Sequence, residues 1–442
     1  IVEVGSSQKL KEKYNAVTII DAKGKTIVPG FIDSHGHISG LGESVTELNL
    51  VGTTSSSQIV KMVAEKISTL NNSNWIRGRG WDQNDWQTKT KEKPFPIAAM
   101  LDSISPNNPV ILSRIDGHAI WVNSKAMEIC GIINELPIEL KNIEGGKILV
   151  DAKGKPTGVF IDNAMNLILS HLPPYTEEEK QKSFELAFQE CLKVGITSVH
   201  DMGIDEQEFE LYKKLYKQNK LPIRIYAAVG GVGELWKRML NEKPFINNTF
   251  TVRAIKLYMD GALGSRGAAL IEPYSDDPAN RGLTITSFDT LVAISEQAVQ
   301  NGFQVCTHAI GDRGNNIVLN AYEKILQKNN NDNVRFRIEH VQILDEKDIS
   351  RFKKNGIIPS MQPTHCTSDM YWAQARVGSK RIRGAYAWRS LLDDGNNIAS
   401  GSDFPVENPN PLYGFYAAIT RQDKDGIPKN VNDVKKYFQG VE

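Results

Sequence analysis

Apolar runs of strand length alternate with amphipathic helical stretches over most of the chain. From residue 176 onward, each helical stretch leads into a short run rich in β-branched residues. Together with the apolar run at the start, the predicted strands lie at 27–37, 195–200, 223–229, 252–258, 303–308, 334–340, 357–362 and 397–403. Eight such strand and helix units predict a closed (β/α)8 barrel, the TIM-barrel type of α/β fold.

Two segments depart from this rhythm. Residues 1–27 alternate apolar and polar positions in short runs, which predicts small antiparallel strands of a β-sandwich subdomain that needs partner strands from elsewhere. After an amphipathic helix at 57–70, residues 70–165 mix strand-like and glycine-punctuated stretches and end in a predicted hairpin at 145–162. We therefore predict a barrel domain over 28–442, with an insertion at about 70–165 after its first strand.

The composition excludes several kinds of partner. Hydrophobic residues make up 40% of the 442 positions, which is enough for a large core. Lys+Arg and Asp+Glu are both 52, so we expect neither nucleic acid nor an anionic membrane as a partner. No apolar run is long enough to span a bilayer, and no signal peptide is visible. The chain starts without Met, so we expect residues to precede Ile1. The four cysteines form no Cys-x-x-Cys, which is typical of free thiols in the cytoplasm. A homodimer is compatible with this composition but not required by it.

Metal-ligating side chains follow the carboxyl ends of five predicted strands. His35 and His37 end the first strand, and because strand side chains alternate between faces, both imidazoles point the same way. The later strands four, five, six and eight end at Lys256, His308, His340 and Asp403. Each residue alone could be a hydrogen-bonded structural residue or a helix cap. Barrel active sites lie at this end of the strands, so the whole set favours a divalent-metal site.

The chain resembles the amidohydrolase superfamily and is most similar to its YtcJ-like, or amidohydrolase-3, branch of metal-dependent hydrolases. The resemblance covers nearly the whole chain and is carried by Val28–His37, Trp75–Gln83, Asp116–Asn123, Val252–Arg266, Thr307–Gly314, Ile338–Gln342 and Gly401–Pro411. It implies a two-metal centre in which an N-carboxylated lysine bridges the ions. The implied ligands are His35, His37 and Asp403 for one ion, His308 and His340 for the other, and Lys256 between them.

The resemblance also implies a reaction. A hydroxide shared by two metals would cleave a C–N amide-type bond (N-acyl, N-formyl or cyclic amide) of a small molecule, with Asp403 as general base. A lysine ammonium offers no lone pair, so Lys256 would act as a carbamate. Zinc, two ions per chain, is the expected metal given imidazole and carboxylate ligands, with manganese, iron and cobalt as alternatives.

Catalytic candidates beyond the ligands come from two histidines. His118 or His365 could polarise the scissile carbonyl. The insertion leaves the barrel where the ligands converge, so we expect His118 to lie near the metals. The insertion also holds four tryptophans, of which we expect two in a pocket wall and two in the insertion's own core: Trp75, Trp81, Trp86 and Trp121.

Candidates for substrate binding stand in or beside the family-like motifs. Arg266 or Arg313 could hold a carboxylate, and Asp260, Trp81 and Gln83 are further candidates. Each could instead make a hydrogen bond that stabilises a loop.

Two other functions and one departure stay open. A mononuclear deaminase or esterase of the same superfamily is the alternative enzyme, and Lys256 argues against it by favouring two metals. A non-catalytic metal-binding barrel is the other alternative, but Asp403 and His308 are both present. Family members usually add closing strands of the β-sandwich after the barrel, whereas residues 431–442 are helix-like, so we expect an incomplete sandwich.

Overall fold

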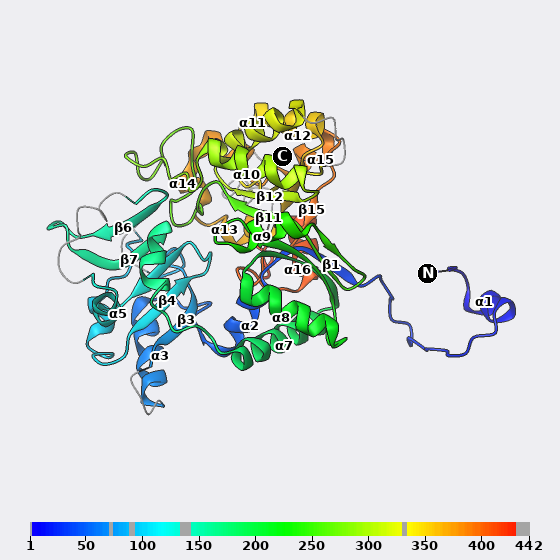
Figure 1. Ribbon diagram of the computed structural model, residues 1–442, viewed down its shortest axis with the longest axis horizontal. Coiled ribbons are helices and arrows are strands. Elements are labelled where there is room, and N and C mark those ends of the chain that lie inside the picture. Colours follow the sequence, from blue (N-terminus) through cyan, green and yellow to red (C-terminus); the bar gives the residue numbers. More distant parts are fainter. Residues whose placement is uncertain (1, 70–73, 88–92, 133–142, 329–333, 430–442) are drawn as a thin grey trace.

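The computed structural model describes residues 2–69, 74–87, 93–132, 143–328 and 334–429, and its larger sheet is a parallel barrel (Figure 1). The barrel strands follow one another in the order β1 (Phe31–Gly36), β8 (Ile196–Ile204), β9 (Arg224–Gly230), β11 (Phe250–Tyr258), β12 (Gln304–Ala309), β13 (Arg337–His340), β14 (Ile358–Met361) and β15 (Ala399–Ser400). A short strand, β10 (Phe245–Ile246), pairs antiparallel with β11. These eight parallel strands correspond to the eight predicted ones, so the predicted TIM barrel is confirmed.

The barrel closes between β1 and the segment that follows β15. Gly36 forms a parallel bridge with Phe404, and the backbone N–H of His37 donates to the Phe404 carbonyl over 2.8 Å. The backbone N–H of Asp403 donates to the His35 carbonyl over 2.7 Å. A Cβ atom at Gly36 would lie 2.5 Å from the Phe404 ring, so this close approach requires glycine. Closure therefore sets Asp403 beside the two histidines of β1.

Asp33 also joins β1 to the segment after β15, through hydrogen bonds made by its side chain. Its buried carboxylate accepts hydrogen bonds from the Ser402 hydroxyl at 2.7 Å and from the backbone N–H of Ser402 at 3.1 Å. It also accepts from the backbone N–H of His35 at 3.0 Å. One side chain thus satisfies donors from both ends of the barrel sheet.

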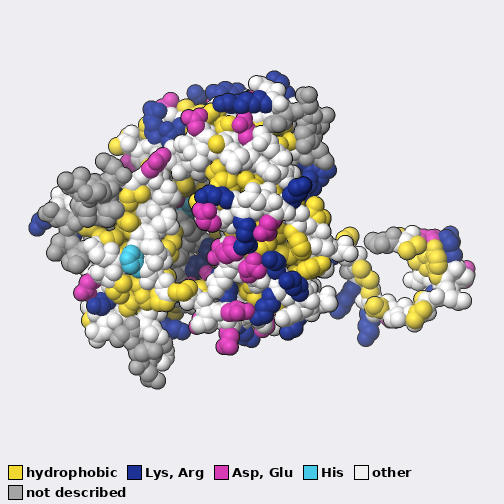
Figure 2. All heavy atoms as spheres, viewed as in Figure 1, with side chains coloured by type: hydrophobic (Ala, Val, Ile, Leu, Met, Phe, Trp, Pro, Cys, Tyr) yellow, Lys and Arg dark blue, Asp and Glu magenta, His cyan; other side chains and the backbone are white. Residues whose placement is uncertain are grey.

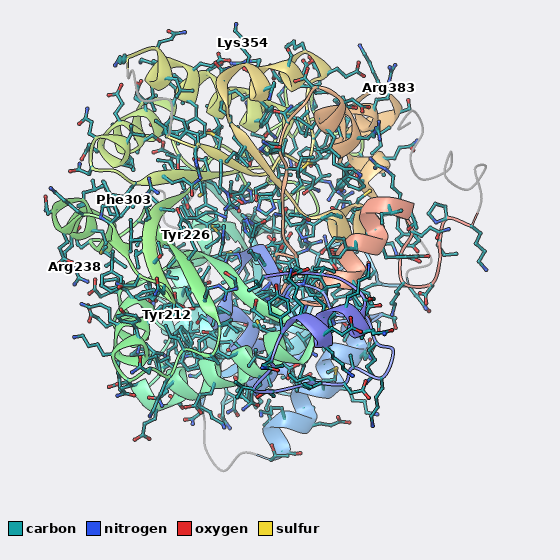
Figure 3. All side chains as sticks on the ribbon, turned by 90° about the vertical axis from the view of Figure 1, so that its right-hand side faces the viewer. Tyr212, Tyr226, Arg238, Phe303, Lys354 and Arg383 are labelled. Atoms are coloured by element: carbon teal, nitrogen blue, oxygen red, sulfur yellow. The ribbon has the colours of Figure 1, made fainter. Side chains whose placement is uncertain are left out.

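Helices cover the outside of the barrel and begin at recognisable caps. Thr176 and Glu179 form a capping box at the start of α7 (Glu177–Lys193), and Asp205 and Glu208 do the same for α8 (Glu206–Lys217). Tyr212 is buried within this layer, whereas Lys354 and Arg383 project from the outer surface (Figure 3). The helices are α2 (Ile38–Thr46), α7 (Glu177–Lys193), α8 (Glu206–Lys217), α9 (Leu235–Glu242), α10 (Phe288–Gln300), α11 (Asp312–Lys328), η3 (Glu346–Asp348), α12 (Ile349–Asn355), α13 (Pro363–Asp369), α14 (Ala373–Arg381), η4 (Ile382–Gly384), α15 (Trp388–Asp393) and α16 (Pro411–Thr420). No helix in the described ranges has the length and apolar character of a membrane span.

The insertion is a second unit with its own sheet, beside the barrel (Figure 1). Its strands lie in the order β2 (Leu48–Asn49), β3 (Ile76–Trp81), β4 (Val110–Arg114), β5 (Ala119–Val122), β7 (Pro156–Asp162) and β6 (Gly146–Val150). Its helices are α3 (Ser56–Ser68), α4 (Ala99–Asp102), α5 (Ser124–Ile129), η2 (Asn163–Met165) and α6 (Asn166–Leu169). The predicted hairpin at 145–162 is present as β6 and β7. The sheet begins before the predicted boundary at 70, and α3 packs on it through Ile59 and Val63.

A tryptophan cluster forms the core of this unit. Trp81, Trp86 and Trp121 are all buried in one apolar cluster, and the ring centroids of Trp81 and Trp121 lie 6.4 Å apart. Trp75 packs against the neighbouring apolar cluster of the insertion. The expected division of the four tryptophans between core and pocket wall is therefore wrong, because all four pack within the insertion.

The N-terminal segment differs from the prediction. Residues 2–30 hold one helix, α1 (Ser7–Lys13), and none of them is in a strand, so the small strands predicted for 1–27 are wrong for this structure. The segment extends from the body as an arm (Figure 1), and its apolar side chains, including Val17 and Ile20, are uncovered (Figure 2). Strands need pairing partners to form, and none lies beside this arm in the described chain. Membership of a β-sandwich stays a prediction, and the helix-like piece expected at 431–442 falls outside the described residues.

Replacing Asp33 with alanine should lower the free energy of unfolding by about 2 kcal/mol or more, because each buried donor left without an acceptor costs roughly 1–3 kcal/mol. Asp151→Ala is the matched control: this aspartate also accepts two backbone N–H groups, from Lys153 and Lys155, but in an exposed turn. Its loss should stay within about 0.5 kcal/mol. Thermal unfolding measures both variants. Equal losses of unfolding free energy would contradict the role of Asp33 in joining β1 to the segment after β15.

Candidate metal centre

The six predicted metal ligands converge at the carboxyl end of the barrel strands. They line one cavity of about 550 Å³, together with residues of the insertion. The ligands that share this lining are His35, His37, Lys256, His308, His340 and Asp403. Residues from β1, β11, β12, β13 and the segment after β15 are thus brought together by the topology of the barrel.

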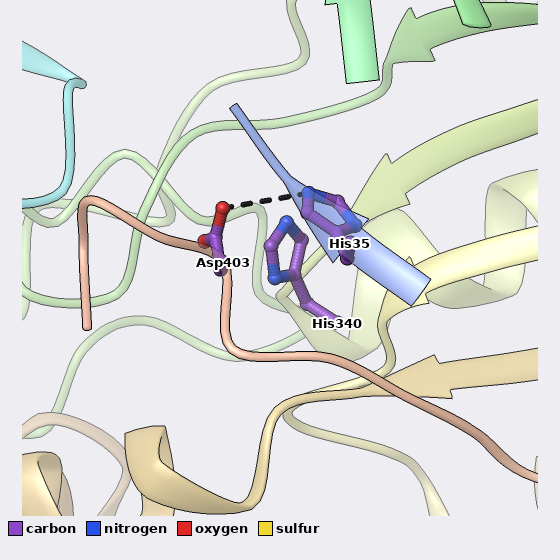
Figure 4. A group of neighbouring side chains, drawn as sticks. All are labelled: His35, His340 and Asp403. Atoms are coloured by element: carbon purple, nitrogen blue, oxygen red, sulfur yellow. Dashed lines mark ion pairs between the residues drawn. The ribbon is translucent and has the colours of Figure 1, made fainter. Parts of the chain in front are cut away.

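Three of these residues are close enough to share one ion. One ligand atom each from His35, His340 and Asp403 lies within 4.8 Å of the others, and all three side chains are buried (Figure 4). His35 Nε2 lies 3.5 Å and His37 Nε2 lies 3.1 Å from Asp403 Oδ1. Two or three imidazoles and a carboxylate are a ligand set that suits zinc and other first-row divalent ions. The residues present therefore fit a metal ion.

The remaining two predicted ligands extend this group. The ring centroids of His308 and His340 lie 4.5 Å apart, and Lys256 Nζ lies 3.5 Å from His35 Nε2. The resemblance paired His340 with His308 around one ion, whereas the tightest group sets His340 with His35 and Asp403. How the ligands divide between two ions stays a prediction.

Buried acceptors fix the orientation of two imidazoles. His35 Nδ1 donates to Glu339 Oε2 over 2.7 Å, because an ionised carboxylate only accepts. His340 Nδ1 likewise donates to Gln362 Oε1 over 2.8 Å. Arg337 in turn holds Glu339, with its Nε 2.8 Å from Glu339 Oε1. The Nε2 lone pairs of both imidazoles are therefore left for a metal, as is usual where an outer partner fixes the tautomer.

Electrostatics keep the buried imidazoles neutral. Burial lowers the pKa of His35 to about 4 and that of His340 well below its ordinary value. Burial also lowers the pKa of Lys256. Burial opposes ionisation of Glu339, but the charge of Arg337, together with His35 and Lys256, holds the pKa of this carboxyl well below its usual range. Neutral imidazoles are the form that binds a metal.

Sequence reasoning missed Glu339, Arg337 and Gln362. Arg337 and Glu339 alternate on β13 immediately before His340, so they share one face of that strand. Gln362 follows β14 directly. A search for polar residues at strand ends, beyond the metal-ligating types, would have found Gln362.

Both histidines predicted as catalytic also line the cavity. His118 precedes β5, its ring centroid lies 5.0 Å from that of His308, and its Nδ1 lies 2.6 Å from Asp162 Oδ1. His365 lies on α13 with its Nε2 3.6 Å from Asp403 Oδ2. Asp162, at the end of β7, was not singled out from the sequence.

The residues predicted to bind substrate do not line this cavity. None of the four is among the described residues that line the cavity: Trp81, Asp260, Arg266 and Arg313. Trp81 is fully buried in the core of the insertion and donates its indole N–H to the Leu112 carbonyl. Gln83 is also buried and accepts from Arg114 Nε.

Loop contacts account for the positions of the other three. The Asp260 carboxylate accepts backbone N–H groups of Ala269, Ile310 and Gly311, and its Oδ1 lies 3.6 Å from Nε2 of the predicted ligand His308. Arg266 forms an ion pair with Asp276 at 3.0 Å. Arg313 donates to the Arg281 carbonyl over 3.4 Å. These contacts hold loops at the barrel mouth, and direct substrate contact by these residues stays a prediction.

Comparisons with known proteins relate this chain to amidohydrolases and metal-dependent hydrolases. The model of the amidohydrolase family matches residues 18–436. The YtcJ amidohydrolase of Bacillus subtilis is 33% identical to this chain over 99% of it and 82% of the relative, and the N-substituted formamide deformylase of Arthrobacter pascens is 26% identical over 93% and 76%. The crystal structure of an uncharacterized metal-dependent hydrolase from Pyrococcus horikoshii superposes with a TM-score of 0.74 at 25% identity, covering 98% of this chain and 80% of that one.

The matched region contains the barrel strands and the residues that converge at their carboxyl ends. From its fold, from the arrangement of its cavity and from these matches, the chain belongs to the amidohydrolase family.

Proposed function

We propose that this protein is a metal-dependent hydrolase that cleaves a C–N amide-type bond of a small molecule. The observation that carries the proposal is the convergence of six metal-ligating residues with His118 and His365 in one cavity. That cavity is large enough for a small-molecule substrate. The similarity to a relative named as a deformylase of N-substituted formamides supports an N-formyl or N-acyl substrate.

The metal centre in this proposal holds two divalent ions, with zinc the expected metal. His35, His37, His308, His340 and Asp403 would hold them, and when bound the ions activate water and polarise a carbonyl. Lys256 would bridge them as a carbamate. Burial favours the neutral amine of Lys256, and the neutral amine is the form that reacts with carbon dioxide.

Two groups move or hold protons in this proposal. Asp403 accepts the proton of the attacking water and delivers it to the leaving nitrogen. His118 donates a hydrogen bond from Nε2 to the oxygen of the scissile carbonyl, where negative charge develops. Burial opposes the protonated form of His118, but the hydrogen bond and charge of Asp162, together with the charges of Asp116 and Asp260, outweigh it and raise the pKa of this histidine. Asp162 is thus the positioning partner of His118.

Lys256→Ala should lose at least one of two bound ions, because the bridging ligand is gone. Elemental analysis of the purified protein measures the metal content, and a short carboxylic acid should restore part of it. Arg253→Ala, at an exposed position of the same strand, is the control and should keep both ions. Retention of two ions by Lys256→Ala, or a bare ammonium beside two bound ions, would contradict the carbamate.

Asp403→Asn should keep the fold and most of the metal but lose about 10²–10⁴-fold in turnover, because an amide cannot accept the proton of water. The measurement uses metal-loaded protein and a panel of N-formyl, N-acyl, cyclic amide and ester substrates. Asp394→Asn, outside the cavity lining, is the control. Activity on esters alone would overturn C–N cleavage, and near-normal turnover in Asp403→Asn would move the base role to His365.

His118→Ala should lower turnover by about 10²–10³-fold at unchanged metal content, the usual scale for loss of one donor to the developing charge. Asp162→Asn should lower turnover less, since the imidazole remains. If Asp162 acts through His118, the double variant should be no slower than His118→Ala alone. Additive losses would show that Asp162 acts independently, and His171→Ala, an exposed histidine, serves as the control.

A further inference from the structure

One cationic side chain in the cavity lining has no acidic partner. Among the described lining residues, the lysine and arginine side chains are those of Arg79, Arg114 and Lys256. Arg114 forms ion pairs with Asp82 and Asp116, and Lys256 belongs to the metal-ligand cluster. Arg79, on β3 of the insertion, forms no ion pair with any residue that the structure describes.

The donors of Arg79 are only partly used. Its Nη2 donates to the Ile115 carbonyl over 2.6 Å, whereas its Nε is buried without a hydrogen-bond partner in the described chain. A guanidinium carries five N–H donors and stays charged in proteins. The Arg79 side chain is half-buried, and a partly desolvated charge without a counter-ion is unfavourable, so an anionic ligand that supplied acceptor oxygens here would be favoured.

The position of Arg79 relates it to the proposed reaction centre. It lines the same cavity as His37 and Asp403. Burial lowers the pKa of Arg79, and the negative charge of Asp403 is the strongest influence against that shift. A ligand bound to Arg79 would therefore lie in the same cavity as the Asp403 carboxylate.

Most acidic residues of the lining are committed to other partners. Asp82 and Asp116 neutralise Arg114. Asp369 accepts hydrogen bonds from Gln342 Nε2 and the Tyr386 hydroxyl. Asp85 and Glu407 form no ion pair with Arg79 in the described chain, and burial raises the pKa of both carboxyls. These carboxyls therefore do not take the place of a ligand at Arg79.

We propose that Arg79 binds a carboxylate of the substrate, so that the compounds hydrolysed are N-acyl or N-formyl amides that carry a carboxylate near the scissile bond. A guanidinium and a carboxylate form two parallel hydrogen bonds, and this geometry gives orientation as well as affinity. The inference rests on the proposed function. It assigns to Arg79 the role that the sequence suggested for Arg266 or Arg313, which the structure places outside the cavity lining.

Binding measured separately from turnover tests this subsite. Calorimetry on metal-loaded protein compares N-formylglycine, N-acetylglycine and N-benzoylglycine, each with its carboxamide analogue. The parent protein should bind each acid at least about tenfold more tightly than its amide, and Arg79→Gln should lose that preference while binding the amides as before. Arg79→Lys, which keeps the charge, should keep part of it.

Arg77→Gln is the matched control, because Arg77 lies two residues earlier on β3 and donates to the Pro173 carbonyl outside the cavity. It should keep the full preference, and melting temperature and metal content of all variants verify folding. Retention of the preference by Arg79→Gln would overturn the subsite, as would equal binding of acid and amide by the parent protein. An equal loss for acids and amides would also overturn it, since Arg79 would then only hold the turn at 115–118.

The two proposals fail in different ways. If the preference depends on Arg79 but no panel substrate is hydrolysed at a C–N bond, the proposed function fails and the carboxylate subsite stands. If amides are hydrolysed without any dependence of binding on Arg79, the proposed function stands and the subsite fails.

Discussion

The parallel bridge between Gly36 and Phe404 is the contact on which the rest of this structure depends. It joins the first barrel strand to the segment after the last one, across almost the whole length of the chain. Because the bridge lies at the carboxyl ends of the strands, it sets His35 and His37 within 3.5 Å of the Asp403 carboxylate. Without closure these side chains would stand at opposite edges of an open sheet, and no metal ion could contact both.

Closure buries a costly set of polar groups, and the surrounding residues compensate for it. A buried charge is tolerated only where it is paired and hydrogen-bonded. Arg337 and Glu339 meet that condition beneath His35, and the neutral Gln362 supplies the hydrogen-bond acceptor beneath His340. The same contacts that satisfy the buried groups also aim the imidazole lone pairs into the cavity. Stability and metal affinity are therefore coupled through these outer residues.

The insertion is a second structural unit that contributes residues to this centre. Its own tryptophan core stabilises a sheet that does not share strands with the barrel. That unit places His118 and Arg79 in the cavity lining, with Asp162 orienting His118, so the groups proposed to bind the carbonyl and the carboxylate of the substrate are separate from the metal ligands. This arrangement allows substrate preference to change in the insertion while the metal centre stays intact.

The sequence by itself determined the barrel and the ligand set. Alternation of strands and helices is a local pattern, and parallel barrel strands end at one face, so residues such as Lys256 and His308 could be placed from strand ends alone. The N-terminal strands were predicted wrongly from the same kind of pattern, because a strand also needs a partner that no local pattern supplies. Only the tertiary structure decided that Trp81 is core, that Glu339 and Asp162 orient histidines, and that Arg79 rather than Arg266 faces the cavity. Those roles depend on which distant segments meet, and hydrogen-bond partners and burial exist only once the sheet has closed and the insertion has packed beside it.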